Sequence, residues 1–144
     1  MTLETWFRSI AKVMAMATKA AELAMLLQDN VDKFEGLSAN HIHAFMIPQD
    51  DTSTDVPILV INEVPMKSRS YANNTPLTEL SRIQITYYCP PTYDGDIEGL
   101  ARSVEAFLLS EGYALYSDAG WAMTPDSQNL TNTYKFNYIK DLLD

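Results

Sequence analysis

The hydrophobic pattern at the start of the chain has the spacing of an amphipathic helix. Over residues 3–28, apolar side chains recur at steps of three and four. Trp6, Met14 and Met25 belong to an apolar stripe that is wider than one core requires. We therefore expect a long N-terminal helix. Its extra apolar surface is either buried in the core or in contact with a neighbouring subunit, through Trp6, Met14 and Met25 in the second case.

Three segments that follow have the composition of β-strands. Residues 41–47 are bounded by Pro48, and residues 56–64 form a continuous run rich in β-branched side chains. Such a run fits a central strand covered on both faces, or on one face and at an interface. Residues 82–89 alternate strictly, which places Ile83, Ile85, Tyr87 and Cys89 on one face of a third strand.

The pattern changes to a helical period after this strand and then returns to alternation. Residues 97–111 form an apolar stripe, and Gly112 stands where a helix C-terminus is expected. Two short strands are predicted around residues 118–120, and residues 133–139 alternate again. The predicted order is αβββαβββ. It indicates an α+β fold in one domain, residues 1–144, with a single mixed or mostly antiparallel sheet and two α-helices packed on one face.

Residues 65–80 form the longest stretch without a periodic signal. A segment of this length inside a compact domain is expected to be a functional loop or an extended hairpin that projects from the body. It contains Lys67, Arg69 and Tyr71. Arg and Tyr are residue types that often carry binding energy at interfaces, so this segment is a candidate contact surface.

Asp94, Asp96 and Glu98 form the densest carboxylate group and have two interpretations. They are ligands of a metal-dependent site, or they stabilise the start of the helix that follows. A calcium loop needs further oxygen ligands at alternate positions, and the residues after Glu98 do not supply them. Asp94 or Asp96 is therefore expected to cap the helix, since carboxylates favour its N-terminus.

The other reactive side chains lack partners in the sequence. His41 and His43 share a strand face, but a zinc site needs a third ligand, so surface or boundary histidines are expected. Cys89 shares a face with apolar residues, which predicts a buried, inert thiol. The sequence has no nucleotide-binding glycine motif and no nucleophile elbow. We expect no catalytic residue, no metal and no cofactor, and hence a protein that is not an enzyme.

Net charge narrows the range of partners. The 144 residues carry ten Lys and Arg against nineteen Asp and Glu, which gives a net charge of −9. Proteins that bind nucleic acid rely on cationic contacts to phosphates, so the excess of acidic residues argues against a nucleic-acid-binding protein. The longest uncharged run in the N-terminal segment, residues 13–18, is too short to span a membrane, and no membrane association is expected.

Four segments spread over nearly the whole chain carry a family resemblance. The resemblance rests on the N-terminal helix, on "HAFMIPQD" followed by "VPILVINEVP", on "RIQITYYCPPTYDGDIEGLARSVEAFLLSEGY" and on "GWAMTPDSQNLTNTYKFNY". These segments look like the tail terminators, also called tail-completion or minor tail proteins, of long-tailed bacteriophages (siphoviruses). The strand, the "YDGDIE" turn and the helix that ends in a "GY" hairpin are the most telling part.

The resemblance implies a structural virion protein. Tail terminators form a ring, usually a hexamer, on the head-proximal end of the tail tube, where they stop polymerisation and provide a docking surface for the head connector. DNA passes through the lumen without specific binding. The partners implied are further copies of the chain, the tail tube protein and the connector protein, first in the host cytoplasm and then in the virion. By analogy, Lys67, Arg69 and Tyr71 are expected to contact the tube.

Three other functions remain open from the sequence alone. One is another head–tail joining protein, such as a connector or head-closure component. Another is a metal-dependent enzyme that uses Asp94, Asp96 and the two histidines. The last is a general binding domain.

Overall fold

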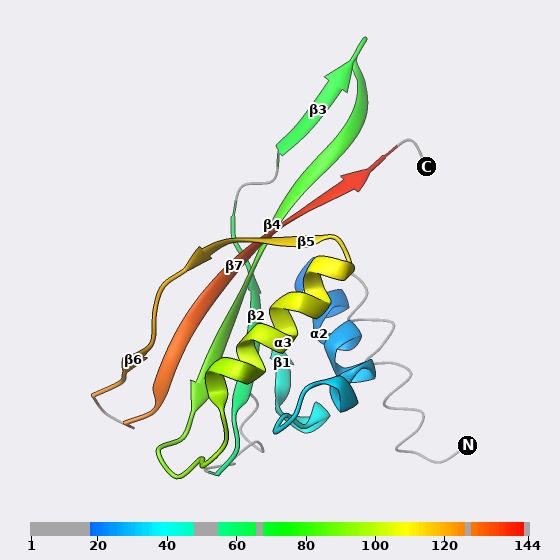
Figure 1. Cartoon of the computed structure of the whole chain (residues 1–144). Coiled ribbons are helices and arrows are strands. Elements are labelled where there is room, and N and C mark those ends of the chain that lie inside the picture. The colour runs from blue at the N-terminus through cyan, green and yellow to red at the C-terminus, as the bar shows by residue number, and fades with distance from the viewer. Residues whose placement is uncertain (1–17, 48–54, 66–67, 126–127, 143–144) are drawn as a thin grey trace.

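The computed structural model describes residues 18–47, 55–65, 68–125 and 128–142 (Figure 1). These residues form two α-helices and a mixed sheet of seven strands, which confirms the α+β class. In chain order the elements are α2 (Lys19–Asp29), the 3₁₀ turns η1 (Val31–Lys33) and η2 (Ala39–His41), β1 (Ile42–Ala44), β2 (Ile58–Glu63), β3 (Ser68–Ala72), β4 (Thr75–Cys89), α3 (Ile97–Ser110), β5 (Tyr113–Asp118), β6 (Ala122–Met123) and β7 (Leu130–Asp141).

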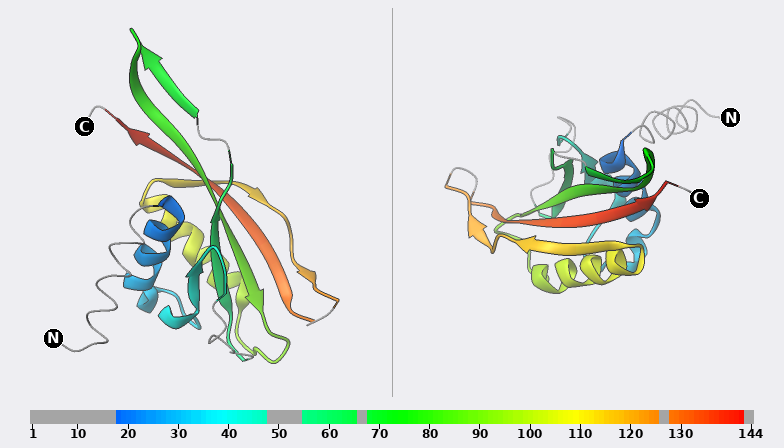
Figure 2. Two further views of the ribbon diagram at one scale, coloured as in Figure 1. Left: turned by 180° about the vertical axis from the view of Figure 1, so that it is seen from behind. Right: turned by 90° about the horizontal axis from the view of Figure 1, so that it is seen from above.

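Two long strands form the centre of the sheet. All twelve residues of β7 pair with β4 in antiparallel register, and the two strands cross the molecule from end to end (Figures 1 and 2). The strands β2 and β3 pair with different stretches of β4, whereas β5 and β6 both pair with β7. At the edge of the sheet, β1 runs parallel to β2. The central pair therefore holds four shorter strands in place.

The strict alternation in β4 produces one apolar core face. Ile83, Ile85, Tyr87 and Cys89 are all buried, as predicted, and Phe136 of β7 lies directly opposite Ile83. Leucine, alanine and valine side chains of α2 and α3 belong to the same core cluster. Burying these side chains is the main favourable contribution to folding.

The N-terminal helix differs from the prediction. A single helix over residues 3–28 is wrong, because Thr18 is extended (φ −126°, ψ 154°) and α2 begins at Lys19. The Thr18 hydroxyl oxygen accepts a hydrogen bond from the backbone N–H of Ala21 at 3.1 Å. A carboxylate oxygen of Glu63 accepts the backbone N–H of Lys19 at 2.9 Å. These two bonds cap the start of α2, which the apolar pattern did not reveal. The predicted helical residues 3–17 lie outside the described residues.

The strands also differ in two places. The predicted strand over residues 41–47 is shorter, because Phe45 has a φ of 71° and turns the chain after Ala44. The predicted order had three strands between the helices, whereas the described residues between them form four. The additional strand, β3, lies in the stretch over residues 65–80 for which a loop or a hairpin was expected.

A two-residue turn makes that stretch a hairpin. Asn73 and Asn74 have φ values of 52° and 64°, and Ala72 pairs with Thr75 across them. Positive φ at both central residues suits the right-handed twist of a hairpin, and asparagine tolerates this conformation better than most residues do. The two asparagines therefore allow β4 to begin far outside the core.

Adjacent leucines at the end of α3 test the core assignment. Leu108 is 0% exposed and Leu109 is 65% exposed. We expect Leu108→Ala to lower the free energy of unfolding by about 2–5 kcal/mol, because it removes buried apolar atoms and leaves a cavity. The matched control Leu109→Ala is expected to change it by less than about 0.5 kcal/mol. Urea denaturation followed by circular dichroism measures both, and equal effects would contradict the packing of α3.

Three aromatic rings form a cluster on the core face. The Tyr134 ring centroid lies 5.3 Å from that of Tyr87 and 6.4 Å from that of Trp121. Such spacings are typical of favourable edge-to-face pairs. Burial, together with nearby Asp118, raises the pKa of Tyr134 to about 12.

This raised pKa makes stability depend on alkaline pH. In the unfolded chain Tyr134 loses its proton near pH 10, whereas in the folded protein the hydroxyl stays protonated up to about pH 12. Its contribution to stability is therefore complete below pH 10 and is lost as pH rises toward 12. Urea denaturation at successive pH values is expected to show this fall. The Tyr134→Phe variant should show a shallower one, and an unchanged slope would contradict the assignment.

Candidate interaction surface

Part of the sheet projects beyond the helices. We call it the arm and define it as β3, residues 75–80 of β4 and residues 139–141 of β7. Figures 1 and 2 show it extending past both helices at one end of the molecule. Because β4 has 15 residues, its C-terminal part pairs with β2 in the body while its first residues pair with β3 in the arm.

The arm exposes apolar side chains. Every residue of β3 is exposed, Tyr71 at 59%. Ile139 of β7 is 66% exposed and pairs directly with Leu80 of β4. Apolar side chains of similar exposure, such as Met46 and Met123, also lie outside the arm, so the feature that marks the arm as a candidate contact surface is its fully exposed outer strand, β3.

A polar cluster surrounds the predicted contact residues Arg69 and Tyr71. The Arg69 guanidinium lies 3.1 Å from a carboxylate oxygen of Glu79 on the neighbouring strand. Hydrogen bonding to Glu79, its negative charge and a further hydrogen bond to Tyr71 raise the pKa of Arg69. An exposed ion pair of this kind adds little stability, but it holds the guanidinium beside the tyrosine.

The other predicted contact residues lie elsewhere. Lys67, Trp6 and Met14 lie outside the described residues. Met25 is half-buried on α2, away from the arm. Sequence reasoning missed Ile139, although a signal was present: alternation in β7 places this apolar residue on the face opposite Phe136 and Tyr138.

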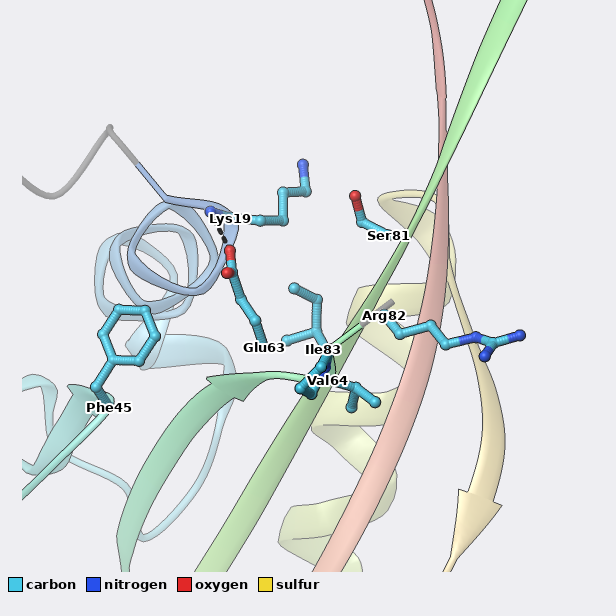
Figure 3. Close-up of a pocket in the computed structure, with 8 residues that line it drawn as sticks. Lys19, Phe45, Glu63, Val64, Ser81, Arg82 and Ile83 are labelled. Carbon is cyan, nitrogen blue, oxygen red and sulfur yellow. Dashed lines mark hydrogen bonds between the residues drawn. The ribbon is translucent and has the colours of Figure 1, made fainter. Parts of the chain in front are cut away.

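A cavity of about 380 Å³ lies at the base of the arm (Figure 3). Phe45, Val64 and Ile83 form much of its apolar wall, and Lys19 and Glu63 also line it. The Lys19 ammonium lies 3.4 Å from Glu22 and 3.6 Å from the centroid of the Tyr138 ring. Since Glu63 caps α2, both charged groups already have partners within the protein, and their arrangement joins α2 to the sheet.

Two of the three predicted carboxylates, Asp94 and Asp96, line a second cavity, of about 570 Å³, at the start of α3. The third, Glu98, is exposed and pairs with Arg102 at 3.3 Å. Asp96 is the N-cap residue, and its carboxylate accepts the backbone N–H of Gly99 at 3.0 Å. Of the two aspartates considered as caps, Asp96 rather than Asp94 fills this role. The Tyr93 hydroxyl occupies the space that a Cβ at Gly36 or Gly95 would need, so both glycines admit the ring.

The side chains considered for metal or nucleophilic chemistry do not form a site in the described part of the chain. No group of three or more His, Cys, Asp or Glu side chains is placed there to hold a metal ion. His41 ends the turn η2, while His43 lies in β1. Cys89 is buried, and burial raises the pKa of its thiol, which disfavours the reactive thiolate.

Comparison with models of known protein families finds no match, and comparison with curated protein sequences finds none. Among the helices of the described residues, none has the length and hydropathy needed to cross a membrane.

The two aspartates before α3 provide a test of the cap. We expect Asp96→Ala to lower the free energy of unfolding by about 1 kcal/mol, because the Gly99 N–H loses its acceptor. Asp94→Ala is the matched control, since it removes a carboxylate close to the same helix end without removing the capping bond. Thermal and urea denaturation compare the variants. A larger loss from Asp94→Ala would contradict the assignment of Asp96 as the cap.

Proposed function

We propose that this protein is a ring-forming tail terminator of a long-tailed bacteriophage. In this role it caps the head-proximal end of the tail tube and stops its growth. The family resemblance suggests the role, and the exposed arm is the structural observation that favours it. A protein that acts by binding other chains needs a surface that remains unsatisfied in the isolated molecule, and the arm provides one.

The arm is suited to contact the tube. Its outer strand, β3, pairs with β4 along one side, and no described strand pairs with its other side. Unpaired strand edges readily bind another chain. Tyr71 and Arg69 stand on this strand, and their neighbour Lys67 would add a positive charge. We infer that the arm meets the tube protein and that the body forms the ring.

The rest of the proposal concerns assembly. Two helices packed on one face of a single sheet would leave the β4–β7 part of the other face for a neighbouring subunit, whereas its β2 part is already buried at Ile58 and Val60. A ring, with a hexamer as the expected order, requires two different surfaces on each copy that fit each other. The net charge of −9 would let DNA pass through the lumen without binding. The head connector would dock on the ring, and the protein would stay in the virion after assembly in the host cytoplasm.

Tails assembled without this protein test the function directly. We expect overlong tubes, because nothing stops polymerisation, and electron microscopy measures their length. Tyr71→Ala should bind purified tubes about tenfold more weakly in co-sedimentation, as expected when an aromatic anchor is removed. Met123→Ala, which removes an exposed apolar side chain outside the arm, should bind normally.

The same experiment also distinguishes a terminator from another head–tail joining protein. Tails of normal length that fail to join heads would reject the terminator and favour a connector or head-closure protein. Normal tails that join heads would reject both roles.

A further inference from the structure

The sheet has a polar face opposite the core. Its residues alternate with the buried residues of β4 and β7 in the body of the sheet. We call it the polar sheet face, and it consists of Arg82, Gln84, Thr86 and Tyr88 of β4 with Thr131, Thr133, Lys135 and Asn137 of β7. All eight side chains are half-buried. Two are cationic and none is acidic, although acids outnumber bases almost two to one in the chain.

The cation at one end of this face has neutral neighbours. Arg82 donates a hydrogen bond to the side-chain oxygen of Asn137 at 3.3 Å, and its guanidinium carbon lies 5.6 Å from the centroid of the Tyr116 ring. Gln84 pairs directly with Lys135 across the two strands. The positive charge of this face is therefore balanced by no acid among its own residues.

One side of α3, exposed at Glu98, Arg102 and Leu109 and half-buried at Glu105, carries a net negative charge. Glu98, Arg102, Glu105 and Leu109 follow one another at helical spacing and form a stripe, which we call the α3 stripe. Arg102 is 75% exposed, and Leu109 is one of the most exposed apolar side chains described. Glu111 follows the helix as its C-cap residue. Within the stripe the Arg102 guanidinium lies 3.3 Å from a carboxylate oxygen of Glu98, so the stripe has a net charge of −1, with an apolar side chain at its C-terminal end.

We propose that the polar sheet face of one copy docks on the α3 stripe of a second copy. Lys135 and Arg82 would lie against Glu105 and Glu98. The contact joins two different surfaces, so it generates a ring when the rotation closes. The inference rests on the proposed ring and names the surfaces that form it.

A second copy fits the polar sheet face better than nucleic acid does. Two cations neutralise few phosphates, and binding to DNA weakens with each phosphate contact that is missing. The chain as a whole is acidic and repels DNA, whereas it supplies its own acidic partner on α3. Complementary charge fixes which surfaces meet and how they are oriented.

Mixed disulfide cross-linking tests the contact. Thr133→Cys is placed in one preparation of the full chain and Arg102→Cys in another. The cations of the sheet face and the acids of the stripe remain, and Arg102→Cys also releases Glu98 from its ion pair. We expect the mixed dimer to form in preference to either homodimer under mild oxidation at low salt. The buried Cys89 serves as background in the wild-type chain, and Ser38→Cys, at an exposed position outside both surfaces, replaces Arg102→Cys as the matched control.

Charge exchange sharpens the same experiment. Adding Lys135→Glu to the Thr133→Cys chain should lower the yield of mixed dimer about tenfold, because two acids would then face each other. Adding Glu105→Lys to the Arg102→Cys chain should restore the yield. Circular dichroism and thermal unfolding verify that each variant is folded, and restoration by the second charge reversal excludes a general loss of structure.

Several outcomes would overturn the inference. A Thr133→Cys homodimer in excess indicates that two sheet faces meet, and equal yields with Ser38→Cys indicate random collision. Absence of any cross-link shows that the faces do not meet. DNA binding that is lost in Lys135→Glu, measured by fluorescence anisotropy, assigns the face to nucleic acid. If tails made without the protein are overlong but no cross-link forms, this contact is rejected and the terminator proposal stands. If the cross-link forms but those tails have normal length, the terminator proposal is rejected and the contact stands.

Discussion

The antiparallel pairing of β4 with β7 is the constraint on which the rest of the molecule depends. Its register places Ile83 opposite Phe136 and Ile85 opposite Tyr134, so that both strands present apolar side chains to the same core. A shift by one residue would turn these side chains to the opposite face. Because the same pairing continues past the core, it also produces the arm and carries Ile139 out to it.

Much of the fold could be predicted from the spacing of apolar residues along the sequence, because burial in the core requires an apolar side chain at each of these positions. The alternation in β4 and the apolar side of α3, predicted over residues 97–111, are both confirmed. The glycine after α3 is confirmed too, since Gly112 adopts a φ of 95°. The errors lie where local hydrogen bonds or backbone conformation act against the apolar pattern. Thr18 caps the start of α2 inside the predicted apolar stripe, and Phe45 ends β1 early.

The candidate surface was predictable only in part. Residue type and the lack of a period pointed to Arg69 and Tyr71, and the structure places them together beside Glu79. Composition did not reveal that they stand on a paired strand, since this depends on a turn formed by two asparagines. Asp94 and Asp96 were both possible caps. The sequence could not choose between them, because the choice depends on which side chain points at the helix start.

The length of β4 has a mechanical consequence. A force applied along the arm runs parallel to β4 and β7, so it loads all the hydrogen bonds between these strands at once, in shear. The strand β3 has a different load path, because a force across the hairpin would open its pairing with β4 one residue at a time from the end. The paired strands β4 and β7 therefore resist a force along the arm, whereas β3 can separate from β4 and pair again while the body of the protein stays folded.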